Sequence, residues 1–140
     1  MNLQMIPIEE FEEIFNLIPG KPEFELWFDE DGPSYMIIKY ADCATFQRCG
    51  NGPRGSGEFE HPSLNALLST DLLDGLNLRR DWSRIQGIIA SDSWHLNNPN
   101  DLQHLKQHYH RNYRSRAISA TMRVKAMHPH TSTTEDWPIV

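Results

Sequence analysis

Two histidines on one predicted helix have the spacing of metal ligands. His104 and His108 are four positions apart, which places two imidazoles on the same helix face. Lys106 lies between them, and its positive charge opposes a divalent cation. A zinc site also needs a third ligand, for which the sequence offers Asp92, Asp101, His95 and the histidines of the C-terminal segment. A metal-binding protein or metal-dependent enzyme using His104 and His108 is therefore one alternative function.

Residues 50–55 (Gly-Asn-Gly-Pro-Arg-Gly) match the G-x-G-x-x-G pattern of dinucleotide-binding loops. That site requires the third glycine to open a helix whose first turn faces the pyrophosphate. Here Ser-Gly-Glu follows, and no helix is predicted before residue 62, so a connecting loop is favoured. Ser93 and His95 are close in sequence, but no Gly-x-Ser-x-Gly motif is present. Without a complete catalytic set, we expect a protein that is not an enzyme and needs no cofactor.

Basic residues are concentrated in the C-terminal third. Residues 102–134 contain six Lys and Arg and no acid. Arg111, Arg114 and Arg116, with tyrosines beside them, are residue types that neutralise phosphate and stack on bases. The whole chain is acidic, however, with a pI near 5.6, and its acidic segments would repel the same polymer. Nucleic-acid binding is a further alternative and not the leading interpretation.

Acidic residues are concentrated at the other end of the chain. Residues 1–31 contain nine acids and one lysine, a net charge of −8. Such a surface captures basic partners rapidly through long-range attraction, and a tryptophan supplies an aromatic anchor of the kind found at interface centres. The predicted partner-binding residues are Glu9, Glu12, Glu13, Glu25, Trp27, Asp29, Glu30 and Asp31.

The leading interpretation is a small acidic cytoplasmic protein that binds a basic protein partner. In size and charge it is similar to bacterial inhibitor or immunity-type proteins, which are acidic single domains that bind a basic enzyme. This similarity implies a protein that acts by occupying its partner, and it rests on no motif. The alternative to an acidic binding surface is that the two charged ends of the chain attract each other within the fold.

Composition limits the class of protein further. The 140 residues carry a net charge of −6, and this length is typical of one domain. No run of about 18 apolar residues exists, so no membrane span is expected. Residues 1–20 hold four glutamates and no basic residue, unlike a signal peptide. Cys43 and Cys49 are too few for a disulfide framework, which favours reduced thiols.

The elements that must position these residues follow from hydrophobic periodicity. Apolar residues at helical spacing predict a helix over residues 8–18. A two-residue period then predicts strands at 23–28, 34–41 and 44–48, with a short edge strand at 58–60. Turn residues separate these strands, which favours an antiparallel meander.

Three more helices are predicted, over residues 62–75, over residues 77–89 and from residue 98 onward. Residues 118–126 alternate like a strand, with a helix starting at Ser115 as the alternative, and residues 128–140 are polar and non-periodic. We therefore predict one α+β domain of residues 1–127, with a C-terminal tail of residues 128–140. In it, a small antiparallel sheet of three to four strands, residues about 22–60, packs with about four helices.

Overall fold

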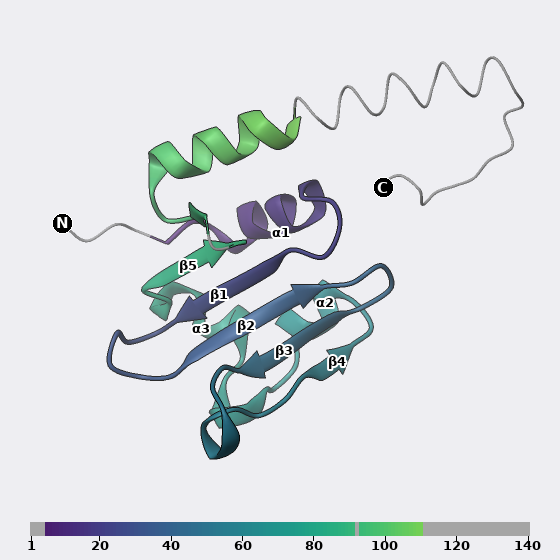
Figure 1. Cartoon of the computed structure of the whole chain (residues 1–140), viewed down its shortest axis with the longest axis vertical. Helices are drawn as coiled ribbons and strands as arrows, with labels where there is room; N and C mark the ends of the chain where they lie inside the picture. The colour runs from purple at the N-terminus through teal and green to yellow at the C-terminus, as the bar shows by residue number, and fades with distance from the viewer. Residues whose placement is uncertain (1–4, 92, 111–140) are drawn as a thin grey trace, which may run out of the picture.

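The described part of the chain is an antiparallel sheet with helices packed on one of its faces (Figure 1). The structure is a computed structural model, and it describes residues 5–91 and 93–110. The helices are α1 (Ile8–Leu17), α2 (Leu64–Leu68), α3 (Leu78–Asp81) and residues 99–110. The predicted α+β class and the number of helices are therefore confirmed for this part of the chain.

The sheet has six strands in the order β4-β3-β2-β1-β5-β6, and every neighbouring pair is antiparallel. Their bounds are β1 (Glu23–Trp27), β2 (Ser34–Lys39), β3 (Ala44–Arg48), β4 (Phe59–His61), β5 (Gly87–Ala90) and β6 (Trp94–His95). The first four are the predicted meander, shifted by no more than two residues at either end. The prediction of three to four strands was too few, because the chain returns after α3 to pair β5 with β1.

The helix predicted over residues 77–89 was wrong beyond its first turns. Asn77 caps α3 as expected, its side chain accepting a hydrogen bond from the Arg80 amide at 3.1 Å. After α3, a 3-10 turn, η3 (Trp82–Arg84), leads directly into β5. Short apolar runs fit a helix or a buried strand equally well. Here β1 provides a free edge for pairing, and β-branched isoleucines suit the resulting strand.

The predicted helix over residues 62–75 is also shorter than expected. Ser63 caps α2 through a hydrogen bond from the Ala66 amide, and the helix ends at Leu68. The chain then forms a separate 3-10 turn, η2 (Leu73–Gly75), in which Asp74 has a positive φ of 59°. Leu72 is already extended, with φ −108° and ψ 176°, and the left-handed Asp74 cannot continue a right-handed helix, so the helix does not reach residue 75.

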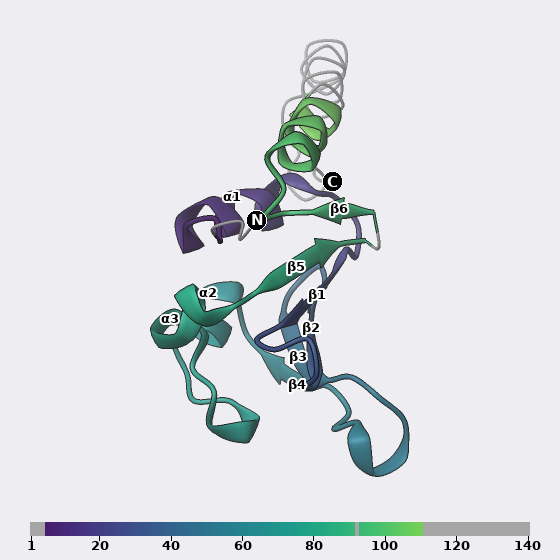
Figure 2. The same ribbon diagram turned by 90° about the vertical axis from the view of Figure 1, so that its left-hand side faces the viewer.

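All three labelled helices lie on the same side of the sheet, as the side view shows (Figure 2). Phe24 and Leu26 of β1 point to this covered side and are fully buried. Phe11 of α1 lies 5.2 Å from the Phe24 ring, and Phe15 lies 5.7 Å from it, measured between centroids. The apolar stripe of α1 therefore packs onto β1, as its helical spacing predicts.

Trp82 links the start of the described chain to the turn that follows α3. Its ring centroid is 5.0 Å from that of Phe11, and its indole N–H donates to the Ile6 carbonyl at 2.7 Å. Because the indole N–H is buried, this hydrogen bond satisfies a donor that would otherwise be costly to desolvate. The segment before α1 is thereby held against the core.

The helix over residues 99–110 packs beside α1 and closes one edge of the sheet (Figure 1). Leu105 is fully buried, and Lys106 forms an ion pair with Glu10 of α1. Asp101 accepts a hydrogen bond from the His95 amide at 3.0 Å, which occupies a donor of the edge strand β6. An edge satisfied by a side chain is a poor template for another strand.

Residues 111–140 lie outside the described residues, and so do the predicted strand over 118–126 and the predicted tail over 128–140. Among the helices of the described part, none combines the length and apolar character that a membrane span requires.

Replacing Phe24 by alanine should lower the free energy of unfolding by about 3–5 kcal/mol, because it leaves a cavity against two aromatic rings. The matched control is Phe59→Ala on β4, since Phe59 is 49% exposed whereas Phe24 is 0% exposed. We expect the control to change stability by less than about 1 kcal/mol. Urea unfolding of both variants makes the comparison, and equal losses would contradict this assignment of the core.

Asp81 should make stability depend on pH. Hydrogen bonds from Arg80 and from the Asn77 amide hold the pKa of this 5%-exposed carboxyl well below its usual range. Its stabilising effect is therefore complete above the unfolded-state pKa of about 3.9 and is lost as the pH falls further. Asp81→Asn should cost about 1–3 kcal/mol at pH 7 and progressively less below pH 4. Urea titrations at pH 7 and 3.5 test this, with exposed Asp31→Asn as control.

Candidate functional site

The face of the sheet opposite α1, α2 and α3 is not covered by any element in the described part of the chain (Figure 2). We call it the outer face and define it by the strand register. It presents Glu23, Glu25, Trp27, Ser34, Met36, Ile38, Thr45, Gln47, Glu60, Gly87, Ile89 and His95. The two predicted partner-binding residues on β1, Glu25 and Trp27, therefore share this face with residues of every other strand.

Charge is distributed unequally between the two faces of the sheet. The outer-face strand positions carry the carboxylates Glu23, Glu25 and Glu60 and no Lys or Arg. The two basic residues of the strands, Lys39 and Arg48, occupy the opposite, helix-covered face by the same register. This segregation gives the outer face a negative potential that the net charge of the chain does not reveal.

The two inward-facing basic residues are used within the fold. Lys39 donates from Nζ to the backbone carbonyls of Phe15 and Ile18, at 2.9 and 2.8 Å. These are carbonyls at the C-terminal end of α1, where a cation is favourable. Burial lowers the pKa of this lysine.

Arg48 forms an ion pair with Asp74 at 2.8 Å, and the same carboxylate accepts a hydrogen bond from the Tyr35 hydroxyl at 2.7 Å. The hydrogen bond from Tyr35 is the main reason that the pKa of Asp74 is lowered. This contact fastens the η2 turn to the sheet. Arg48 therefore neutralises a carboxylate of the covered side and leaves the acids of the outer face unopposed.

A row of mixed character crosses the middle of the outer face. Glu25 lies directly opposite Met36 of β2 and Ile89 of β5. Side chains in such cross-strand pairs are about 4.5–5.5 Å apart at Cβ. An acidic side chain is thus flanked by two partly exposed apolar ones.

Trp27 lies at the end of β1, with Gly87 on one neighbouring strand and Ser34 on the other. A Cβ atom placed on Gly87 would lie 2.2, 2.6 and 2.9 Å from the Trp27 ring atoms Cζ2, Cε2 and Cη2. No side chain larger than hydrogen fits there, because these distances are far below van der Waals contact. The indole therefore lies over the glycine, and Trp27 as a whole is partly exposed.

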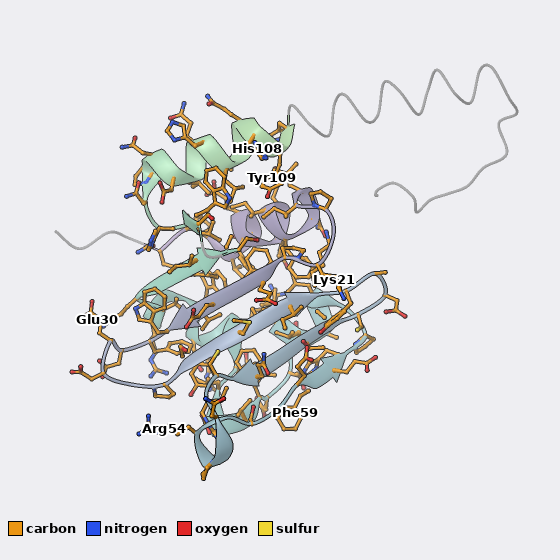
Figure 3. The ribbon with its side chains drawn as sticks, viewed as in Figure 1. Lys21, Glu30, Arg54, Phe59, His108 and Tyr109 are labelled. Carbon is orange, nitrogen blue, oxygen red and sulfur yellow. The ribbon has the colours of Figure 1, made fainter. Side chains whose placement is uncertain are left out.

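The turn after β1 adds three exposed acids beside Trp27. Asp29 accepts a hydrogen bond from the Asp31 amide at 3.1 Å, and its carbonyl accepts one from Gly32 at 3.0 Å. Glu30 lies at the tip of this turn, at one end of the sheet (Figure 3). Within residues 5–91 and 93–110, neither these acids nor Glu25 has a Lys, Arg or His partner within ion-pair distance.

A hydrogen-bonded group occupies the opposite end of the outer face. Glu58 accepts hydrogen bonds from the hydroxyls of Thr45 at 2.6 Å and Tyr40 at 2.7 Å. These bonds lower the pKa of Glu58, with Thr45 the larger contributor, and raise the pKa of Tyr40. Lys21 lies over the Tyr40 ring at 5.5 Å from its centroid, so the cation of the acidic N-terminal segment is at this end (Figure 3).

The two cysteines, Cys43 and Cys49, are free thiols that feel the charges of outer-face carboxylates. Burial is the main cause that raises the pKa of Cys49, with a smaller contribution from the charges of Glu25 and Glu23, while a hydrogen bond with Ser34 opposes it. Burial also raises the pKa of Cys43, and the charge of Glu60 adds to it. Both thiols are therefore protonated near neutral pH, which does not suit a nucleophile.

The predicted acids of α1 lie on the helix side of the sheet, away from Trp27. Glu12 is 3.4 Å from Arg79, and Glu10 pairs with Lys106. Glu9 and Glu13 are exposed and line a shallow groove between α1 and the helix over residues 99–110. The predicted partner-binding residues are thus divided between two surfaces, and the described acidic and basic segments pair at only one point, Glu10–Lys106.

The histidines of the metal alternative are exposed on the helix over residues 99–110. His108 packs against Tyr109, with ring centroids 4.7 Å apart, and lies 6.2 Å from the Trp94 ring (Figure 3). Among the residues that the structure describes, no three His, Cys, Asp or Glu side chains meet in a metal-binding group. The described residues therefore provide no third ligand for a metal site at His104 and His108. Arg111, Arg114 and Arg116 of the nucleic-acid alternative lie outside the described residues.

Of the outer face, the sequence interpretation identified only Glu25 and Trp27, and it missed the neighbours that pack beside them, Met36, Gly87 and Ile89. Met36 stands in a strand that is apolar on both faces, which hid the side to which it points. Gly87 and Ile89 were assigned to a helix, although a glycine beside two β-branched residues is also a strand signal. Comparisons with protein-family models, curated proteins and solved structures found no match for this chain.

Gly87→Ala should displace the Trp27 indole, because the added methyl group would overlap the ring. We expect a loss of about 1–3 kcal/mol in unfolding free energy, typical of overpacking, and a shift of one indole N–H resonance in the NMR spectrum. Trp27→Leu identifies that resonance by its disappearance. In the Trp27→Leu background, Gly87→Ala should cost less, and an equal cost in both backgrounds would refute the contact.

Proposed function

We propose that this protein binds a basic protein partner through the outer face of its sheet. The observation that carries the proposal is the one-sided charge of the strands: the outer face holds Glu23, Glu25 and Glu60, while Lys39 and Arg48 are used on the other side. The exposed turn with Asp29, Glu30 and Asp31 extends this negative surface. Attraction to a positive partner would speed association and favour one orientation of encounter.

The composition of this surface supports a protein interface. Met36 and Ile89 are partly exposed apolar side chains on either side of Glu25 in the middle of the face, and the partly exposed Trp27 lies at its end, next to the acidic turn. Interfaces commonly combine an aromatic anchor and an apolar centre with a polar rim. The apolar centre would supply affinity, whereas the acids would supply speed and choice of partner.

Of the two groups of predicted binding residues, the proposal rests on the group at the outer face. Glu25, Trp27, Asp29, Glu30 and Asp31 belong to it. The acids of α1 belong to a separate surface, and one of the predicted residues there, Glu12, is already paired with Arg79. A partner centred on Trp27 would therefore not need Glu9, Glu12 or Glu13.

The mode of action that fits such a surface is occupation of the partner, as in inhibitor or immunity-type proteins. A small acidic domain that covers a basic site excludes that site's substrate and needs no chemistry of its own. The protonated thiols of Cys43 and Cys49 are consistent with a non-enzymatic role. We place the complex in the cytoplasm, where free cysteines such as these remain reduced.

The proposal is tested by two double variants that change the net charge by the same amount. Glu25→Gln with Glu30→Gln should weaken binding of a basic protein at least about fivefold at low ionic strength, because one charge is lost from the outer face and one from the turn beside it. Glu9→Gln with Glu13→Gln removes the same charge from α1 and should change binding by less than twofold. The partner is first isolated by pull-down with the tagged chain from a lysate of the cells that encode it. Calorimetry with the purified partner then gives the affinities of the two double variants.

Raising the salt concentration should weaken binding of the unmodified chain and reduce the difference between the two variants. Retention of no basic protein even at low salt would refute the proposal. An equal loss in both double variants would show that net charge alone, and not the outer face, determines binding.

A further inference from the structure

We infer that Trp27 is a stacking platform for an arginine side chain of the basic partner. This inference rests on the proposed function and identifies the group that the Trp27 end of the outer face recognises. It is carried by the packing of the indole on Gly87 together with the carboxylates around it. A flat aromatic surface next to negative charge is the arrangement that binds a guanidinium group.

The contact with Gly87 orients the indole. Three bonded atoms of its benzo ring approach the position of a glycine Cβ at 2.2–2.9 Å, and the central atom, Cζ2, is nearest. These distances fit a ring that lies across the glycine better than one that points at it with an edge. One face of the ring is therefore covered by the sheet, and its opposite face is directed away from it.

The neighbours of Trp27 on the outer face are small. Gly87 has no side chain, and Ser34, directly opposite on β2, has a short one. Trp27 is partly exposed as a result, although it belongs to the central strand of the sheet. A planar group therefore has room to approach the indole from outside.

Negative charge stands on both sides of the platform along the chain. Glu25 precedes Trp27 by two residues on the same face of β1, a distance of about 7 Å. Asp29 follows it by two residues, at the start of the acidic turn. A guanidinium group over the indole would thus be within reach of a carboxylate, to which it donates two parallel hydrogen bonds.

Within the described part of the chain, no Lys or Arg side chain lies over the Trp27 ring. Its cation–π contacts are Lys21 over Tyr40, Lys39 over Phe15 and Arg84 over Phe28. Arg84 also pairs with Asp81, so this protein already combines stacking with a carboxylate at another position. Arginine suits the arrangement better than lysine, because its planar group stacks and donates in fixed directions.

Two peptides of equal charge test the inference directly: blocked tetra-arginine and blocked tetra-lysine. Titrated into the full-length chain at low ionic strength, tetra-arginine should bind about threefold more tightly and should shift the indole N–H resonance of Trp27. Trp27→Leu should remove this preference, so that the two peptides bind within a factor of about 1.5. The matched control is Phe59→Leu, which should retain the preference. Phe59 is the one large hydrophobic side chain classed as exposed in the described part of the chain.

Gly87→Ala provides a second variant, because it keeps the tryptophan but lifts it from the sheet. It should also reduce the preference for arginine, and circular dichroism verifies that both variants are folded. If the preference persists in Trp27→Leu, or is absent in the unmodified chain, the inference is wrong.

The double variant Glu25→Gln with Glu30→Gln separates this inference from the proposed function. It should weaken both peptides. If it does so while the peptides do not discriminate, the acidic binding surface stands and the arginine platform falls. If neither peptide binds the unmodified chain at low salt, the arginine platform is refuted, whereas the proposed function is decided by the retention of a basic protein.

Discussion

The alternation of side chains along β1 is the constraint on which the rest of the structure depends. β1 is paired on both sides, with β2 and with β5, so its orientation sets that of the whole sheet. Phe24 and Leu26 must face α1 because they are fully buried, and Glu23, Glu25 and Trp27 then face the other way. A shift of one residue would expose two core residues and bury two carboxylates, which excludes that register.

The same constraint separates the charges of the sheet. With the register set, Lys39 and Arg48 point to the covered side, where carbonyls of α1 and the Asp74 carboxylate receive them. The outer face keeps its acids without a basic neighbour on the strands. The features that hold the fold together are therefore also the features that leave one face negative, with an indole at its end. The register of the sheet therefore underlies both the packing of the core and the negative surface of the proposed function.

Local periodicity predicted α1 and the meander, because each of these elements is built from neighbours in sequence. It failed for β5, whose pairing depends on β1 about 60 positions earlier, and so also for β6, which pairs with β5. Helical spacing of Trp82, Ile85 and Ile89 was real but coincidental, since the free edge of β1 gave the chain a better partner. The close packing of Trp27 on Gly87 could not be read from either residue alone. The candidate site was thus predicted in its acids and Trp27 but not in its apolar neighbours.

By itself, the sequence determined the class of the fold, the amphipathic faces of α1 and β1, and the excess of acid in the first 31 residues. Only the tertiary structure decided which acids act together. Glu9 to Glu13 and Glu25 to Asp31 form one run of charge along the chain, yet Glu25 lies on the face opposite α1, and Asp29 to Asp31 lie in the turn at one end of the sheet. The reason is physical: a helix packed on one face of a strand turns its exposed residues away from the strand's other face. The sequence therefore predicted that the first 31 residues are acidic, and tertiary packing determined on which surfaces these acids lie.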